Sequence, residues 1–180
     1  MRKVLLDWVY LKLHSVYSTV PELHTDILQA YSDHYVANSS GDSWFEGVAH
    51  MLADLQQQGV KLAVATGKSR KGLDRVLKQT NSEELFVSTR AASETHSKPH
   101  PLMLEEILAE TGVQAEHAIM VGDTSYDLEM AQNIAMPRVG VSYGVHSVEV
   151  LQHFNPLYIA HDVAALHQFL NRHIQSSEVA

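Results

Sequence analysis

The sequence has no cysteine among its 180 residues. This absence excludes a disulfide framework and any site built on a thiolate. No apolar run approaches the ~20 residues that a membrane-spanning helix needs, and the N-terminus lacks the apolar segment of a signal peptide. We therefore expect a cytoplasmic protein without a membrane partner.

Basic residues are also few: 13 Lys and Arg stand against 21 Asp and Glu, for a net charge of −8. They form no long cluster, which argues against a nucleic-acid partner. The 12 histidines are scattered, and we expect most of them to be surface residues. An apolar content of 45% is typical of a globular chain, and this length favours a single domain with one sizeable core.

Short apolar runs alternate with amphipathic segments along most of the chain. Alternating strands and helices of this length are typical of a parallel sheet covered by helices on both faces, a three-layer α/β/α architecture. Gly59 and Gly112 stand where helices end. The expected strands are 60–65, 85–87, 118–121, 138–141 and 157–159, and the expected helices are 45–58, 69–79, 101–111, 124–134, 148–154 and 163–172.

The segment 118–131, A-I-M-V-G-D-T-S-Y-D-L-E-M-A, organises the rest of the chain. Its first four residues predict a buried strand, and Asp123 follows at the strand's carboxyl end, where α/β sheets bind ligands. Thr124 and Asp127 form a capping pattern that begins a helix. Carboxylates so placed could hold a divalent cation, although a turn residue and a helix cap would explain them equally well.

Two further polar groups follow other predicted strands. Thr66 and Gly67 follow one strand, and Lys98 lies in the loop after the next. A hydroxyl with backbone N–H groups, an ammonium and a carboxylate are suited to phosphoryl transfer. Each is weak evidence alone, but three in this order form a stronger signal.

These motifs resemble the haloacid dehalogenase superfamily, in particular its phosphoglycolate-phosphatase-like branch. The matching stretches are V-A-T-G-K-S-R-K-G-L, S-K-P-H-P, V-G-D-T-S-Y-D-L-E-M-A and V-S-Y-G-V, and the resemblance runs from residue 44 to the end. It implies a Rossmann-like sheet and a Mg²⁺ cofactor. It also implies that Thr66, Gly67 and Lys98 bind phosphate, that Asp123 ligates the metal, and that Asp127 supports it from a second shell.

The first motif of that family, D-x-D-G-T, is incomplete here. The nearest stretch is L-D-W-V-Y-L, residues 6–11, so the resemblance implies Asp7 as nucleophile and metal ligand, with Val9 in place of the second aspartate. We expect residues 1–7 and 44–180 to form the core domain and 8–43 to be a remnant of the family's helical cap. Alternatively, the chain begins inside the cap and Asp7 matches by accident.

Packing bears on these alternatives. In this fold the strand of the first motif lies between the strands that end at Thr66 and Asp123. An empty slot would leave two rows of buried backbone groups unpaired, at ~1–3 kcal/mol each. Arg2–Leu6 is the unused strand candidate for that slot, and a partner chain is the other way to fill it.

The implied activity is Mg²⁺-dependent hydrolysis of a small phosphorylated metabolite, a phosphomonoester, through a phospho-aspartate. Two rival interpretations stay open. A degenerate relative could keep the scaffold for binding or regulation without catalysis. A phospho-acceptor receiver domain fits poorly, because receivers cluster their acidic residues at the start of the chain. The sequence leaves the oligomeric state open.

Overall fold

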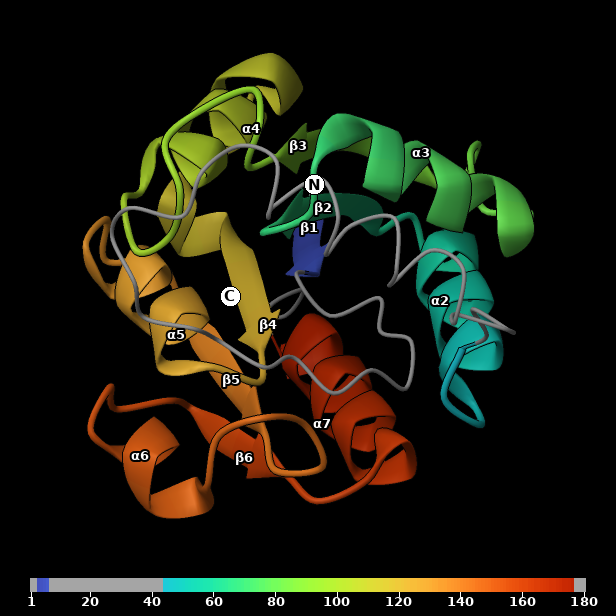
Figure 1. Cartoon of the computed structure of the whole chain (residues 1–180). Helices are drawn as coiled ribbons and strands as arrows, with labels where there is room; N and C mark the ends of the chain where they lie inside the picture. Colours follow the sequence, from blue (N-terminus) through green and yellow to red (C-terminus); the bar gives the residue numbers. More distant parts are fainter. Residues whose placement is uncertain (1–2, 7–43, 177–180) are drawn as a thin grey trace.

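The computed structural model describes residues 3–6 and 44–176, which form one parallel six-stranded sheet with helices packed around it (Figure 1). The strand order is β3-β2-β1-β4-β5-β6. The strands are β1 (Lys3–Leu6), β2 (Lys61–Thr66), β3 (Phe86–Ala91), β4 (Ala118–Gly122), β5 (Arg138–Val141) and β6 (Tyr158–Ala160). The helices are α2 (Val48–Gln57), α3 (Arg70–Gln79), α4 (Leu102–Thr111), α5 (Ser125–Gln132), α6 (Val148–Gln152) and α7 (Val163–Ser176), with a 3₁₀ turn at Ala115–His117.

The first strand fills the centre of the sheet, as the packing argument predicts. Lys3 is in register with Lys61 of β2 on one side and with Ala118 of β4 on the other. Parallel pairing along both edges satisfies the backbone groups that an empty slot would leave unpaired. Asp7 and the segment 8–43 lie outside the described residues, so the domain boundaries stay a prediction.

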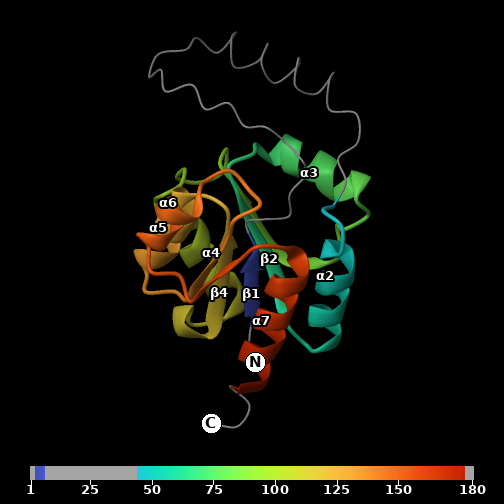
Figure 2. The same cartoon turned by 90° about the horizontal axis from the view of Figure 1, so that it is seen from below.

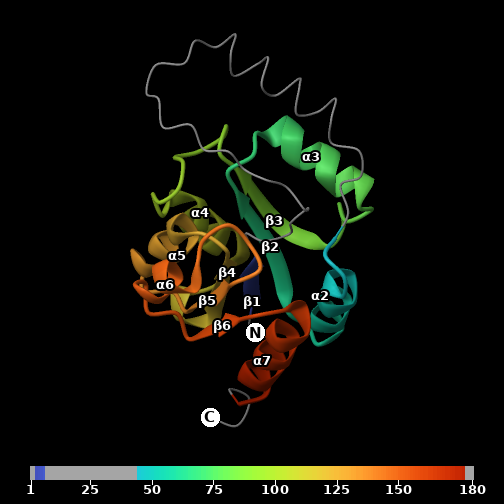
Figure 3. The same cartoon turned by 60° about the horizontal axis from the view of Figure 1, so that its bottom comes forward.

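Two layers of helices enclose the sheet, which confirms the three-layer architecture (Figures 2 and 3). Side chains alternate across a strand, so β2 sends Leu62 and Val64 to the face covered by α2, α3 and α7. Ala63 and Ala65 point to the opposite face, which α4 and α5 cover. No helix in the described part of the chain is both long and apolar enough to span a membrane.

The third strand is longer than the sequence predicts. The expected strand ends at residue 87, whereas β3 continues to Ala91 because its register with β2 carries on to the pair Thr66↔Ala91. The polar side chains in this stretch do not form an apolar run, so the sequence alone does not predict a strand there. Arg90 is held by ion pairs of 2.8 Å to Glu106 and 2.9 Å to Glu110, both on α4.

Helix ends differ from expectation by a few residues. The helix expected from residue 45 begins at Val48, because Gly47 adopts a left-handed φ of 86° just before it. The helix expected to reach residue 134 ends at Gln132, and the backbone turns at Ala135 with φ of 54°. These local turns shorten the helices without moving the sheet.

Candidate active site

The predicted polar groups Thr66, Gly67, Lys98 and Asp123 all lie at the carboxyl edge of the sheet, which faces the viewer in Figure 1. Thr66 is the last residue of β2 and is 4% exposed. Its Oγ1 accepts a hydrogen bond from the backbone N–H of Lys68 at 3.3 Å, so the loop that contains the exposed Gly67 folds over the hydroxyl. The Ala92 N–H donates to the Lys68 carbonyl at 2.9 Å and joins this loop to the one that carries Lys98.

Asp123 follows β4 and is held tightly by the loop after β5. The Val145 N–H donates to Asp123 Oδ2 at 2.9 Å. A Cβ at Gly144 would lie 2.2 Å from Asp123 Cβ, so only glycine allows the loop to approach this closely. The carboxylate is 6% exposed and has little freedom to move.

Asp127 performs two tasks at once. Its Oδ2 accepts from the Thr124 N–H at 3.0 Å and from Thr124 Oγ1 at 2.7 Å, which completes the capping box of α5. Its Oδ1 accepts from Lys98 Nζ at 2.8 Å. The pair is buried, with 1% of the Asp127 side chain and 10% of the Lys98 side chain exposed. Asp127 is therefore a helix cap that also fixes the ammonium group beside Asp123.

Burial, together with the nearby charge of Asp127, raises the pKa of Asp123 from 3.8 to about 6, although the Val145 N–H and Lys98 act in the opposite direction. A buried carboxylate of this kind gains from a cation, because a cation offsets both the desolvation and the repulsion. The residues therefore fit a hard divalent ion with oxygen ligands. Within the described ranges, no three His, Asp or Glu side chains gather to hold one, and Asp7, the other predicted ligand, lies outside them.

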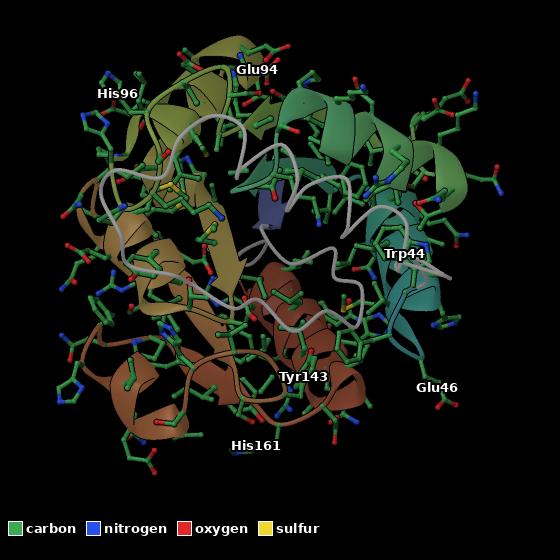
Figure 4. The ribbon with its side chains drawn as sticks, in the orientation of Figure 1. Trp44, Glu46, Glu94, His96, Tyr143 and His161 are labelled. Atoms are coloured by element: carbon green, nitrogen blue, oxygen red, sulfur yellow. The ribbon has the colours of Figure 1, made fainter. Side chains whose placement is uncertain are left out.

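Loops from both halves of the sheet surround this edge. Figure 4 shows Glu94 and His96, which follow β3, on one side, and Tyr143 and His161, which follow β5 and β6, on the other. Burial raises the pKa of the Tyr143 hydroxyl, with the charges of Asp162 and Asp123 adding to the effect. Tyr143 therefore stays protonated, and its ring meets Phe45 edge-on at 5.8 Å between centroids.

Sequence reasoning missed His146 in this region. Its Nδ1 accepts a hydrogen bond from the Ser125 N–H at 2.9 Å. The two residues are 21 positions apart, and no local sequence motif predicts a contact between residues so far apart in the chain. The V-S-Y-G-V stretch that precedes His146 was the available signal, because it resembles the family in the loop after this strand.

A parallel sheet with Thr66, Lys98 and Asp123 at one edge defines an α/β protein of the haloacid dehalogenase type. The family model described as "Haloacid dehalogenase-like hydrolase" matches residues 10–141, and the chain belongs to this family.

Relatives agree with this assignment. The chain is 36% identical over 116 residues to "Probable phosphatase IndB" of Dickeya dadantii, which covers 64% of this chain and 50% of that one. It is 29% identical over 161 residues to "Pyrophosphatase PpaX" of Bacillus cereus, and this match covers 86% of this chain and 73% of that protein. The chain thus spans only about half the length of IndB, and of the PpaX protein of Halalkalibacterium halodurans.

Solved structures share the fold. The "predicted phosphoglycolate phosphatase" of Haemophilus somnus superposes with a TM-score of 0.74 at 24% identity, covering 83% of this chain and 69% of that one. A haloacid dehalogenase-like family protein of Streptococcus pneumoniae superposes with a TM-score of 0.71 at 20% identity. This match covers 81% of this chain and 69% of that one.

Proposed function

We propose that this chain is a phosphatase that hydrolyses a small phosphomonoester through a phospho-aspartate on Asp7, with Mg²⁺ as cofactor. The observation that carries the proposal is the convergence of Thr66, Lys98 and Asp123 at the carboxyl edge of a sheet whose central strand ends at Leu6. The next residue in the sequence is Asp7. Membership of the family and the phosphatase names of the relatives support the same activity.

The proposed chemistry has two steps. A carboxylate oxygen of Asp7 attacks phosphorus, the bond from phosphorus to the ester oxygen breaks, and the leaving oxygen takes a proton from water to give the alcohol. Water then attacks the acyl phosphate, which returns the Asp7 carboxylate and releases inorganic phosphate. Asp7 and Asp123 would hold Mg²⁺, which when bound neutralises charge on the phosphoryl oxygens.

The chain's own residues hold the phosphoryl group in place. The Thr66 hydroxyl and the Gly67 N–H donate to phosphate oxygens, the Lys68 N–H orients that hydroxyl, and Lys98 adds positive charge beside them. Lys98 keeps its ammonium in a fixed position because Asp127 binds it at 2.8 Å. Orientation of this kind lowers the barrier without any reorganisation at the moment of reaction.

Val9 makes the second step slow in this scheme. The resemblance puts it where the family has an aspartate that acts as general acid and then as general base, and valine can do neither. General acid–base catalysis is worth ~10²–10⁴ in rate, so we expect turnover reduced by about that factor and accumulation of the phosphorylated enzyme.

Intact-protein mass spectrometry tests the proposal. The wild-type protein is mixed with Mg²⁺ and acetyl phosphate, a donor whose leaving group needs little protonation. We expect a mass increase of one phosphoryl group, together with slow phosphate release. Asp7→Asn should remove both, and Asp7→Glu, which keeps the charge but moves the carboxylate, is the matched control for local electrostatics. Turnover that survives Asp7→Asn would refute the assignment of the nucleophile.

A further inference from the structure

The His146 ring is locked between two loops that border the candidate active site. Its Nδ1 accepts from the Ser125 N–H at 2.9 Å, at the first residue of α5. Its own backbone N–H donates to the Asp123 carbonyl at 3.0 Å. The segment is held further by the preceding residue, Val145, whose N–H binds the Asp123 carboxylate. His146 is therefore fixed to the same aspartate that we assign to the metal.

This hydrogen bond sets the tautomer of the ring. A nitrogen that accepts from an N–H cannot itself carry a proton, so the neutral ring has its proton on Nε2. His146 is consequently a hydrogen-bond donor through Nε2.

The surroundings of the ring suit a ligand. His146 is half-buried, and among the described residues none accepts a hydrogen bond from its Nε2. Val145 is 46% exposed, and Tyr126 is 38% exposed with its ring centroid 5.9 Å from that of His146. A fixed polar N–H beside an exposed aliphatic and an exposed aromatic residue is suited to orient an organic group.

The position of His146 in the sheet indicates which part of the substrate it meets. Thr66 follows β2, Asp123 follows β4, and His146 belongs to the loop after β5, one strand further out. The strand order and the hydrogen bond of 3.0 Å from the His146 N–H to the Asp123 carbonyl put His146 beside Asp123, on the side away from Thr66. A ring donor one strand beyond the phosphate-binding residues is suited to the part of a substrate that extends past the phosphoryl group.

We propose that His146 is a specificity-determining residue, whose Nε2–H donates to an oxygen of the substrate's leaving group beside Val145 and Tyr126. This inference rests on the proposed phosphatase function. The favoured substrates carry an acceptor oxygen on the leaving group, either a carboxylate or a second phosphoryl group. Phosphomonoesters with a purely hydrocarbon leaving group gain nothing from this contact.

Two substitutions distinguish the role of Nδ1 from the role of Nε2. In His146→Asn the amide oxygen can replace Nδ1 and keep the Ser125 bond, but nothing replaces Nε2–H. In His146→Gln the amide N–H can reach the Nε2 position, although the Ser125 bond is lost. If His146 has only a structural role, His146→Asn should behave like the wild-type protein and His146→Gln should not. Our proposal predicts instead that His146→Asn loses the substrate preference and that His146→Gln keeps part of it.

The test uses three probes with Mg²⁺: phosphoglycolate, pyrophosphate and ethyl phosphate. Phosphoglycolate has the same two-carbon skeleton as ethyl phosphate, with a carboxylate in place of the methyl group. A hydrogen bond to a charged acceptor is worth ~10–100-fold, so His146→Asn should lower kcat/KM for phosphoglycolate, pyrophosphate or both by that factor, mainly through KM. The value for ethyl phosphate should change less than about threefold, and His146→Gln should regain part of the loss. The probe that responds identifies the acceptor.

Ligand-induced thermal stabilisation is measured in parallel, because it needs no turnover. If wild-type protein binds phosphoglycolate or pyrophosphate better than ethyl phosphate and His146→Asn abolishes the difference, the inference holds even where no phosphate is released, and only the proposed activity fails. If turnover occurs and His146→Asn affects all three probes equally, or none, the inference is wrong while the activity stands. If wild-type protein binds none of the probes, the inference is wrong, and the proposed activity is then judged by the Asp7 adduct with acetyl phosphate.

Discussion

Asp123 should make metal binding dependent on pH. Its pKa is raised to about 6, and a metal ligand must be ionised to bind. At about pH 5 roughly one molecule in eleven has this carboxylate ionised, against roughly ten in eleven at about pH 7. We therefore expect the apparent Kd for Mg²⁺ to be about tenfold weaker at the lower pH.

The assay is thermal unfolding over a Mg²⁺ titration. At a concentration ten times the Kd that holds near neutral pH, stabilisation should be ~1.4 kcal/mol near pH 7 and ~0.4 kcal/mol near pH 5. For a chain of this size those free energies correspond to shifts in Tm of roughly 3–6 °C and about 1 °C. Asp123→Asn should show no shift at either pH. A Kd that is constant between these pH values, or a metal shift that survives Asp123→Asn, would refute the reasoning.

Without metal, the same pKa makes a prediction of the opposite sign. Because the folded-state pKa of Asp123 lies above the unfolded value of 3.8, its protonated form contributes stability below about pH 4, and this contribution is lost as the pH rises through about 6. The full loss is about 3 kcal/mol, since one pKa unit is worth ~1.4 kcal/mol.

The carboxyls whose pKa is lowered, Glu94 and Glu110, act in the opposite direction but at lower pH and at exposed positions. Urea unfolding of metal-free protein between about pH 4.5 and 6.5 checks the sign, and Asp123→Asn should flatten the dependence.

Two more substitutions probe the site's construction. Gly144→Ala puts a Cβ 2.2 Å from Asp123 Cβ, so the loop must shift and the Mg²⁺-dependent gain in Tm should fall by more than half, with catalytic activity falling alongside. Lys98→Met leaves the buried Asp127 carboxylate without its ammonium partner at 2.8 Å and should cost ~3 kcal/mol in urea unfolding.

Each of these substitutions has a matched control. Gly72→Ala meets Ser69 Oγ at 3.3 Å rather than the buried Asp123 side chain at 2.2 Å, and it should leave the metal response unchanged. Lys71→Met removes an exposed ammonium from α3 and should change stability by no more than about 0.5 kcal/mol. A Gly144→Ala protein that binds metal normally would show that the loop does not fix Asp123. A Lys98→Met cost equal to that of Lys71→Met would show that the buried pair contributes nothing.

The sequence alone predicts the alternation of strands and helices, because apolar periodicity and helix caps are local. The capping box of Thr124 and Asp127 and the strand before Asp123 follow from a dozen consecutive residues. The packing argument for the central strand also needs only the sequence and the fold type, and the structure confirms it for Lys3–Leu6. The family motifs likewise depend on spacing along the chain.

The tertiary structure decides the properties that depend on distant neighbours. Residues Ser88–Ala91 become strand because β2 supplies the ladder, although their own side chains are largely polar. The raised pKa of Asp123 comes from burial and from the charge of Asp127, neither of which a sequence displays. The Lys98–Asp127 pair joins residues 29 positions apart, and the tautomer of His146 depends on a backbone N–H 21 positions away. Such contacts exist only after the loops meet at one edge of the sheet. The sequence therefore shows which side chains are present, whereas the fold determines their pKa values, partners and orientation.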